Sequence, residues 1–361
     1  MNIVYLGWGH HIHLRRWAEY FAKRGERVTV LSLTPPGSEL PKVRMIPLVC
    51  ARRREALLKA EIRLWLRLLR ADIFHVHWAG FAPLAAGIGH CPTGITAWGS
   101  DIYKYPSYSE QVQQSIRNAL KFARFVTCDS YDLKSRIAEI SGRQDHVHVV
   151  QWGVDTDLFR PGLDTTAWRE RIGIHGATRV VYSPRSVNEI YNIDKVLEAF
   201  ARLTYFRPDT VLIQKYYNAD PARLQKLQEL AARLEIVDRV KWVGEVAYED
   251  LPALYNLADI MVTVPHSDGT PMALLEGMAC GVPPVVSSVP SVLEWIEAGR
   301  NGLVVPAGDS DGLFQAMKRL FNEESLGREM VVHNLRVVEQ RASQNVSMQK
   351  AHLIYRRTCS P

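Results

Sequence analysis

Residues 259–288 read DIMVTVPHSDGTPMALLEGMACGVPPVVSS, a pattern that predicts a strand, a loop, a helix and a second strand in direct succession. The apolar run Ile260–Val264 predicts the first strand. A helix is expected to begin at Thr270 and Pro271 and to end at Gly281, because proline favours the first helical position and glycine the position after the last. This stretch therefore predicts the α/β class.

The same stretch carries two carboxylates, Asp268 just outside the expected helix start and Glu276 about two turns inside it. The free N–H groups and the dipole at that helix start, which follows Gly269, favour an anion such as a diphosphate. Each carboxylate could accept hydrogen bonds from hydroxyl groups of an extended ligand, Asp268 beyond the phosphates and Glu276 nearer the sheet. The alternative is that Asp268 only caps the helix and Glu276 pairs with a nearby base.

Short apolar runs alternate with helix-length segments along the rest of the chain. The first half opens with a strand at 2–6, a helix near 14–24 and a strand at 27–33; further strands are expected at 73–78, 94–98, 125–130 and 146–152. The alternation restarts after the turn-rich GVDTDLFRPG at 153–162, with strands expected at 179–184, 210–216, 240–244 and 259–265 and helices near 193–204 and 221–234.

This order predicts two Rossmann-like, doubly wound domains that face each other across a cleft, since open α/β sheets bind ligands at the carboxyl ends of their strands. The expected boundaries are residues 1–155 and 156–335. Residues 332–357 read as helical, and we expect the segment 336–361 to return to the first domain.

The chain of 361 residues has 47% hydrophobic and 23% charged residues, which is typical of a folded globular protein with two domains. No window of 18 apolar residues is present, and the N-terminal sequence reaches histidine and arginine too early for a signal peptide. The 5 cysteines lack any CxxC pair, so we expect neither a disulfide framework nor a zinc ribbon. These features predict a cytoplasmic protein.

The net charge of +6 favours anionic partners without choosing among them. Most informative is the stretch Arg52–Arg70, RRREALLKAEIRLWLRLLR, which predicts a basic amphipathic helix. Its apolar face is expected to contain Leu57, Leu58, Ile62, Leu66 and Leu69. Two interpretations stay open: a surface helix that buries its leucines on a sheet, or peripheral attachment to the inner face of an anionic membrane.

Several motifs together resemble glycosyltransferase family 4, the retaining glycosyltransferases with the GT-B fold. They are the run from Asp268 to Glu276 with the following MACGVPPVVSS, Glu294, NGLVVPAGD at 301–309, TAWGSD at 96–101, GVDTDLFRP at the linker, and VGEV with LPALYNLADI before the first strand quoted above. The resemblance spans both predicted domains. The family carries an E-x7-E motif, and this chain has aspartate in its first place.

The resemblance implies a nucleotide-sugar donor, expected to be a UDP- or GDP-sugar, on the second domain and an acceptor on the first. It implies that Asp268 contacts the transferred sugar, that Glu276 contacts the ribose, and that the backbone of Gly269, Thr270, Pro271 and Met272 contacts the diphosphate or sugar. Gly244, in VGEV, is a further donor-site candidate. No other cofactor is implied.

A cation near the leaving diphosphate would lower the barrier to breaking the glycosyl phosphate bond. Arg185 stands where the family has an arginine, but Tyr191 and Asn192 stand where the family usually has Lys-Gly. Lys195 or Lys215 could replace that lysine, although Lys195 is equally compatible with a solvated helix position.

In the first domain, Trp98 stands where many relatives have histidine, and Asp101 follows as a candidate catalytic ligand or a cap of the next segment. The loop with Gly7 and Gly9 can approach a phosphate or sugar closely, but it lacks GxGxxG, so a nicotinamide cofactor is not supported. His11 and His75 are candidate cleft residues, with buried core histidines as the alternative.

Three His-x-His pairs, at 11/13, 75/77 and 146/148, do not predict a metal site because no third ligand accompanies them. The DTD at 155–157 lies in the linker, where turn and cap chemistry explain it. No nucleic-acid-binding motif accompanies the basic helix.

We therefore expect a metal-independent, retaining glycosyltransferase that uses a sugar, a lipid-linked or a small-molecule acceptor. The alternatives are a GT-B nucleotide-sugar epimerase, a phosphorylase, or a GT-B protein that has lost catalysis and acts as a binding or scaffold subunit. The departures at Asp268, Tyr191 and Trp98 motivate the last alternative.

Overall fold

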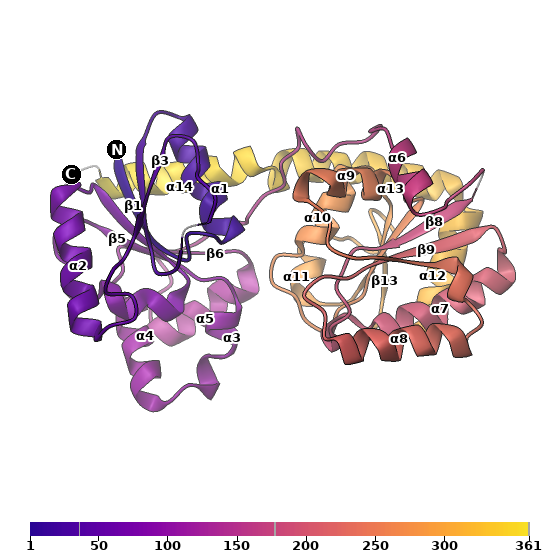
Figure 1. Ribbon diagram of the computed structural model, residues 1–361, viewed down its shortest axis with the longest axis horizontal. Helices are drawn as coiled ribbons and strands as arrows, with labels where there is room; N and C mark the ends of the chain where they lie inside the picture. Colours follow the sequence, from indigo (N-terminus) through magenta and orange to yellow (C-terminus); the bar gives the residue numbers. More distant parts are fainter. Residues whose placement is uncertain (36, 177, 360–361) are drawn as a thin grey trace. The chain divides into compact units, whose positions relative to one another are not determined.

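The computed structural model describes residues 1–35, 37–176 and 178–359. The chain divides into two compact units, which we call unit 1 (Met1–Trp152 with Ser347–Pro361) and unit 2 (Gly153–Val346). Each unit is built around one parallel sheet with helices on both faces (Figure 1). Two parallel-sheet α/β units are the architecture expected from the alternation of strands and helices in the sequence.

The sheet of unit 1 has the strand order β3-β2-β1-β4-β5-β6-β7. Its strands are β1 (Asn2–Gly7), β2 (Arg27–Ser32), β3 (Val43–Pro47), β4 (Ile73–His77), β5 (Thr93–Thr96), β6 (Phe125–Cys128) and β7 (Val147–Val149). All pairs are parallel; Ile3, for example, lies opposite Val28 on one side and Ile73 on the other. Strand β4 is buried along its whole length, as a central strand covered on both faces must be.

The helices of unit 1 form because their apolar residues recur with helical spacing. They are α1 (Ile12–Lys23), α2 (Glu55–Leu68), α3 (Ser100–Tyr103), α4 (Glu110–Phe122), α5 (Tyr131–Ser141) and α14 (Gln344–Cys359). Helix α1 buries Leu14, Trp17 and Phe21. Helix α5 begins where the Ser130 hydroxyl accepts a hydrogen bond from Leu133 N, and it ends at Gly142, whose φ is +70°.

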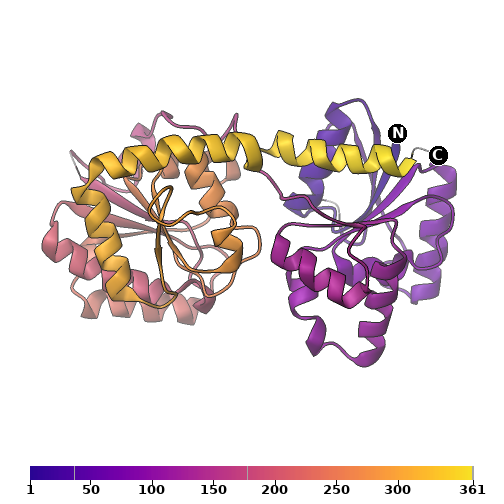
Figure 2. The same cartoon turned by 180° about the vertical axis from the view of Figure 1, so that it is seen from behind.

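Helix α14 lies beside the strands of unit 1, although it is far from them in sequence (Figure 2). Tyr355 is fully buried, and its ring stacks on Phe21 with a centroid distance of 4.9 Å. Its hydroxyl lies 2.5 Å from Nδ1 of His75 and donates to the Tyr5 hydroxyl at 3.2 Å. These contacts anchor the C-terminal helix to unit 1.

The sheet of unit 2 has the strand order β10-β9-β8-β11-β12-β13, again with all pairs parallel. Its strands are β8 (Arg179–Ser183), β9 (Thr210–Lys215), β10 (Val240–Val243), β11 (Ile260–Thr263), β12 (Pro284–Ser287) and β13 (Leu303–Val305). Its helices are α6 (Thr166–Arg171), α7 (Ile193–Phe206), α8 (Pro221–Arg233), α9 (Leu251–Asn256), α10 (Met272–Ala279), α11 (Pro290–Leu293), α12 (Ser310–Asn322) and α13 (Glu324–Val337).

The helical segment expected over residues 332–357 is two helices, not one. A π-helical turn at Val338–Ala342 and an extended residue, Ser343, separate α13 from α14. Val154 N donates to Ala342 O at 2.8 Å, and Gln344 N donates to Val154 O at 2.7 Å. Val154 of the linker thus forms an isolated β-bridge with Ser343, and this bridge takes backbone hydrogen bonds that a continuous helix would have made.

The basic stretch 52–70 forms α2, but its apolar face is narrower than expected. Leu58, Ile62 and Leu66 are buried, whereas Leu57 is 51% exposed, so its assignment to the buried face was wrong. Leu57 is one residue before Leu58, a rotation of about 100° around the helix, which turns its side chain away from the sheet. Among the described residues, no helix combines the length and apolar character that crossing a bilayer requires.

Candidate active site

Four neighbouring strands of unit 2 end at candidate donor-site residues. In the order β10-β9-β8-β11, Gly244 follows β10, Lys215 ends β9, Arg185 follows β8 and Asp268 follows β11. Because the carboxyl ends of parallel strands meet at one edge of a sheet, the topology gathers residues that are far apart in sequence. An added Cβ at Gly244 would lie 3.3 Å from the Tyr216 hydroxyl, so little space is left beside this glycine.

Helix α10 begins near this edge with an open N-terminus. Pro271 is its N-cap residue, and no side chain caps the helix. Thr270 and Pro271 are buried and Met272 is partly buried. At the other end, Gly281 has φ +77°, and Val282 N donates to Gly277 O at 3.0 Å, as the sequence predicted for the helix end. The positive end of the helix dipole at this start can receive an anion.

Close packing fixes the position of α10 on the sheet. Leu274, Leu275 and Met278 are fully buried. An added Cβ at Gly277 would lie 2.3 Å from the Met261 sulfur on β11, so only glycine allows the helix to approach the strand this closely. The helix start is therefore held rigidly relative to the end of β11.

Arg185 and Asp268 form a buried ion pair at the start of this helix. Arg185 Nη2 lies 3.3 Å from Asp268 Oδ1 and 3.2 Å from Oδ2, and the two side chains are only 12% and 11% exposed. Gly269 N also donates to Oδ1, at 3.0 Å. Burial raises the pKa of Asp268, while Arg185 and the Gly269 amide act in the opposite direction. Burial is the largest single effect and would lower the pKa of Arg185, but Asp268, Tyr191 and Tyr217 together raise it by more, so the guanidinium stays charged.

Two atoms of this pair are buried without a hydrogen-bond partner in the described structure, Arg185 Nε and Asp268 Oδ2. A buried polar atom without a hydrogen bond costs about 1–3 kcal/mol, so such atoms commonly mark a place that a ligand fills. The pair thus offers one donor and one acceptor side by side, the combination that a phosphate oxygen and a sugar hydroxyl require.

Tyr191 occupies the place of the expected second cation. Its ring lies under the Arg185 guanidinium, 4.2 Å from ring centroid to Cζ, in a cation–π contact. The next residue, Asn192, has φ +54°, a left-handed conformation that glycine and asparagine both tolerate. Asn192 Nδ2 also donates to Val264 O at 2.8 Å, which ties this turn to the end of β11. The chain therefore keeps the turn with asparagine and exchanges a cation for an aromatic ring.

Glu276 is buried in the second turn of α10, where the Tyr255 hydroxyl donates to its Oε2 at 3.1 Å. The pKa of Lys215 is lowered, mainly by burial and also by Arg185. Glu276 acts in the opposite direction, which shows that its carboxylate lies near the Lys215 amine. Lys195 is engaged elsewhere, 2.9 Å from Glu198 and 3.8 Å from Asp194. Of the two lysines considered from the sequence, Lys215 is the one that faces the site.

Two polar residues that the sequence did not single out hold the backbone of the site. Gln214 Nε2 donates to Arg185 O at 2.8 Å and to Lys215 O at 2.7 Å. Ser291 Oγ donates to Asp268 O at 2.8 Å. Neither residue belongs to a motif, and their roles depend on strand neighbours that only the fold brings together.

In unit 1, aromatic side chains gather at the carboxyl ends of the strands. Trp8 follows β1, Trp78 follows β4 and Trp98 follows β5, three adjacent strands. The Trp8 ring centroid lies 5.0 Å from that of Trp78 and 5.7 Å from that of Trp98. His11 lies 4.1 Å from Trp98. We call Trp8, His11, Trp78 and Trp98 the aromatic cluster.

The backbone of Trp78 in the aromatic cluster has an unfavourable conformation. Trp78 has φ +86°, which is unfavourable for a bulky residue and is typical of functional sites. Gly80 makes room for its ring, because an added Cβ there would lie 2.1 Å from it. His11 and Trp98 were candidates from the sequence, whereas Trp78 was missed; a tryptophan at or within two residues of the end of each of three predicted strands was the available signal.

Asp101 is fully buried and supports the cluster from below. Its Oδ2 accepts hydrogen bonds from Ala79 N at 2.6 Å and from Trp98 N at 3.2 Å, and Oδ1 accepts from Trp98 N at 3.0 Å. Burial raises its pKa to about 6, and the backbone N–H groups partly oppose this. Asp101 thus holds the backbone of the two loops that carry Ala79 and Trp98.

Other unit 1 candidates also serve the fold. His75 is fully buried, with Nδ1 beside Tyr355 and Nε2 2.8 Å from the Thr96 hydroxyl, so it is the core histidine of the two interpretations. An added Cβ at Gly9 would lie 2.5 Å from Ser32 Oγ, and one at Gly7 would lie 3.2 Å from a Leu14 methyl group. Both glycines therefore allow close packing within the protein itself.

The histidine pairs and the DTD segment are not gathered with further ligand side chains in the part of the chain that the structure describes. Within the described residues, no three His, Cys, Asp or Glu side chains are placed to hold a metal ion. Asp155 Oδ1 accepts from Asp157 N and Leu158 N, the turn chemistry expected from the sequence.

Burial lowers the pKa of His11 to about 4, with His10 adding to the effect, so the ring is neutral at pH 7.

Two family models match the chain. The model described as Glycosyltransferase Family 4 matches residues 9–158, and the model described as Glycosyl transferases group 1 matches residues 164–334. The two matches coincide with the two halves that the linker GVDTDLFRPG separates in the sequence, and the second contains the whole of the site around Arg185 and Asp268.

Individual relatives are distant but consistent. The chain is 24% identical over 265 residues to N-acetyl-alpha-D-glucosaminyl L-malate synthase of Bacillus anthracis, which covers 72% of this chain and 68% of that protein. It is 26% identical over 227 residues to mannosylfructose-phosphate synthase of Agrobacterium fabrum, covering 61% and 50%. It is 30% identical over 203 residues to a GDP-mannose-dependent alpha-(1-6)-phosphatidylinositol monomannoside mannosyltransferase of Mycolicibacterium smegmatis, covering 54% and 52%. The chain spans about half the length of the latter two.

Solved structures resemble the chain over its full length. Anabaena HepE in complex with UDP gives a TM-score of 0.84 at 18% identity and covers 99% of this chain and 100% of that one. Sucrose-phosphate synthase from Thermosynechococcus elongatus gives a TM-score of 0.82 at 18% identity, covering 99% of each. With both halves matched by family models and both sheets matched by these folds, the chain belongs to glycosyltransferase family 4 and is a glycosyltransferase with the GT-B fold.

Proposed function

We propose that this glycosyltransferase moves a sugar from a nucleoside-diphosphate donor to an acceptor, with retention of configuration at the anomeric carbon. The observation that carries the proposal is the buried Arg185–Asp268 pair beside the uncapped start of α10, with Arg185 Nε and Asp268 Oδ2 left without hydrogen bonds. In this proposal unit 2 holds the donor and unit 1 holds the acceptor.

In this proposal, different residues of unit 2 bind different parts of the donor. The start of α10 and Arg185 bind the diphosphate, because both present positive charge to it. Asp268 accepts a hydrogen bond from a hydroxyl of the transferred sugar, and Glu276 accepts from the ribose. Lys215 is the second cation in place of the lysine that Tyr191 replaces. The Mycolicibacterium relative depends on GDP-mannose, and a solved neighbour holds UDP-glucose, which supports a UDP- or GDP-sugar.

The proposed reaction needs no metal step. The acceptor oxygen attacks the anomeric carbon on the face from which the diphosphate departs, so the bond to the acceptor forms as the bond to the phosphate oxygen breaks. The acceptor proton passes to the departing phosphate oxygen. Arg185 and the backbone N–H groups at the start of α10 stabilise the negative charge that develops there.

The aromatic cluster of unit 1 is the proposed acceptor surface. Trp8 and Trp98 are only partly buried, so their rings provide apolar surface against which a sugar ring or a similar ring system would pack, and the neutral His11 adds a polar nitrogen beside them. Trp98 occupies the place of a histidine in many relatives, so the acceptor contact here rests on stacking and less on hydrogen bonding.

Helix α2 is the proposed contact with an anionic membrane, which would place a lipid-linked acceptor near unit 1. Leu57, Leu64 and Leu68 are 51%, 56% and 65% exposed on a helix that carries Lys59, Arg63 and Arg67, and further arginines flank it at 52–54 and 70. Exposed leucines among basic residues are typical of helices that lie in a membrane interface. The test is co-sedimentation with phosphatidylglycerol vesicles, which Leu57→Asp with Leu64→Asp should abolish and Leu293→Asp, exposed on unit 2, should not.

The first experiment on the reaction is a thermal-shift panel of UDP-, GDP- and ADP-sugars with their free nucleotides, because a ligand of the folded state raises its melting temperature. The stabilising donor is then supplied with candidate acceptors, and the anomeric configuration of the product is read by NMR. Asp268→Asn should lose transfer, and Glu276→Gln should weaken donor binding.

Other outcomes would replace the proposal. Full transfer activity in Asp268→Asn would contradict the role proposed for Asp268, and unchanged donor affinity in Glu276→Gln would contradict the role proposed for Glu276. An inverted product contradicts retention. Product formed without an acceptor indicates an epimerase, and a strict requirement for inorganic phosphate indicates a phosphorylase.

A further inference from the structure

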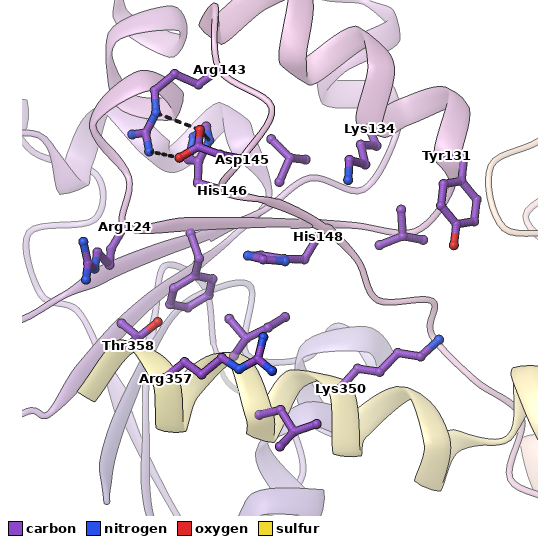
Figure 3. Close-up of a pocket in the computed structure, with 15 residues that line it drawn as sticks. Arg124, Tyr131, Lys134, Arg143, Asp145, His146, His148, Lys350, Arg357 and Thr358 are labelled. Carbon is purple, nitrogen blue, oxygen red and sulfur yellow. Dashed lines mark hydrogen bonds and ion pairs between the residues drawn. The ribbon is translucent and has the colours of Figure 1, made fainter. Parts of the chain in front are cut away.

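Unit 1 contains a cavity of about 540 Å³ away from the aromatic cluster (Figure 3). It lies along the outer edge of β7, the last strand of the sheet, between α5 and α14. Helix α14 lines it with one face, residues Lys350, Leu353, Ile354, Arg357 and Thr358. All lining residues belong to unit 1. The volume is within the range of pockets that bind small molecules, about 300–1,000 Å³.

The cavity is strongly basic. Its lining includes Arg124, Lys134, Arg143, Lys350 and Arg357, against one carboxylate, Asp145. Asp145 is 74% exposed and is bound by Arg143, with N–O distances of 3.3 and 3.1 Å.

The other four cations have no ion-pair partner among the described residues. They line one solvent-open hollow, so their charges act on a common space. Like charges around one cavity repel one another, and an anion inside would relieve that repulsion.

These cations surround the side chain at the centre of the edge strand. Figure 3 shows them around the His148 ring, with Arg124 toward one end of the edge strand and Lys350 toward the other. Burial lowers the pKa of His148, and Lys134, His146 and Arg357 lower it further, while Asp145 opposes them. The positive potential of the lining therefore reaches the centre of the cavity.

The edge strand adds a backbone donor. Val126 N donates to His146 O, and Val150 N donates to Cys128 O, so residues 146, 148 and 150 turn their backbone groups toward β6. Because the backbone N–H and C=O groups of successive residues in a strand point to opposite sides, those of Val147 and Val149 point toward the outer edge of the sheet. Val147 N is occupied by Gln144 O, which leaves the N–H of Val149 directed to the cavity side.

We propose that this cavity is a second ligand site, which binds an anion carrying a phosphoryl group, up to the size of a sugar phosphate. Cationic side chains at both ends of the cavity and a backbone N–H at its wall provide the donors that phosphoryl oxygens accept from. A free phosphate compound and the phosphate headgroup of a lipid share this chemistry. The site stands on its own residues and does not depend on the donor site of unit 2.

The test uses the full chain and sodium diphosphate as the probe, with sodium chloride of equal ionic strength as the reference. Hydrogen exchange followed by mass spectrometry should show protection in the segments 143–150 and 350–358. Lys134→Gln with Arg357→Gln should weaken binding at least tenfold, since each variant removes a charge-assisted hydrogen bond to the anion. The matched control, Lys23→Gln with Arg53→Gln, removes the same charge at exposed positions outside the cavity and should bind normally.

Two further variants separate this site from the donor site of unit 2 and from a loss of folding. Arg185→Met removes the proposed diphosphate ligand of unit 2, and protection at 143–150 should persist in it. Lys134→Arg with Arg357→Lys retains the charges and should restore binding, which distinguishes a lost ligand contact from a damaged fold.

Vesicles of phosphatidylglycerol form the second arm of the test. Protection at 143–150 by vesicles but not by diphosphate identifies the source of the phosphoryl group as a lipid headgroup and supports the site. Absence of protection with both probes, or equal diphosphate affinity in the Gln double variant and the wild type, would overturn the proposal.

Discussion

The Arg185–Asp268 pair gives the sharpest prediction about stability. At 3.2 Å, two unit charges attract by about 5 kcal/mol if the effective dielectric constant is about 20. Both side chains are nearly inaccessible, so loss of one partner leaves the other charge buried without compensation, at a cost of about 3–5 kcal/mol. The cation–π contact with Tyr191 contributes only about 1–2 kcal/mol and cannot replace the carboxylate.

We therefore expect Asp268→Asn and Arg185→Met each to lower the free energy of unfolding by about 3 kcal/mol, and the double variant to lower it by about the same amount. The coupling energy between the two residues is then about 3 kcal/mol. The measurement is urea unfolding of the full chain without nucleotide, with hydrogen exchange of peptides from β8 and α10 assigning the transition to unit 2. Single-variant effects that add to within about 0.5 kcal/mol would show that the two side chains are not paired in solution.

Three more predictions concern unit 1. Burial raises the pKa of Asp101 from 3.8 to about 6, so the folded chain holds the carboxyl proton more tightly than the unfolded chain. The protonated carboxyl therefore contributes stability that is fully present below pH 3.8 and is lost as the pH rises through 6. Asp101→Asn should remove this contribution, which reduces the difference between the urea midpoints at pH 4 and pH 7. Gly9→Ala should destabilise the chain by about 1–3 kcal/mol, because the new methyl group would lie 2.5 Å from a neighbouring hydroxyl oxygen, whereas Gly89→Ala has open space and should change the melting temperature little. Tyr355→Phe should cost about 1–3 kcal/mol, because it leaves His75 with a buried ring nitrogen unbonded; a melting temperature equal to that of the wild type would contradict this role.

The local pattern of the sequence predicted most of the elements that position the site. The start and end of α10 were readable because proline and glycine have strong positional preferences, and Asp268 and Glu276 were found with them. The edge strands β3 and β13 were missed, because β3 has charged and exposed residues and β13 spans only Leu303–Val305. Short edge strands carry little periodicity to recognise.

The partners of these residues could not be predicted from local pattern. Arg185 and Asp268 are 83 positions apart and meet only because β8 lies beside β11 in the sheet. Asp101 carries a motif position in the sequence, yet the N–H of Ala79 that it binds comes from the loop of another strand. The sequence around Tyr191 does not indicate that its ring lies under the Arg185 guanidinium.

By itself, the sequence determined the α/β class, the two-part organisation and the resemblance to a glycosyltransferase family, because these depend on spacing along the chain. Only the tertiary structure decided which charges pair, which aromatic rings form one cluster, and that residues 124–149 and 350–358 enclose a basic cavity. The physical reason is that strand order in a parallel sheet differs from order in the sequence, so the contacts that bury a charge or leave it unpaired arise between segments that carry no information about each other.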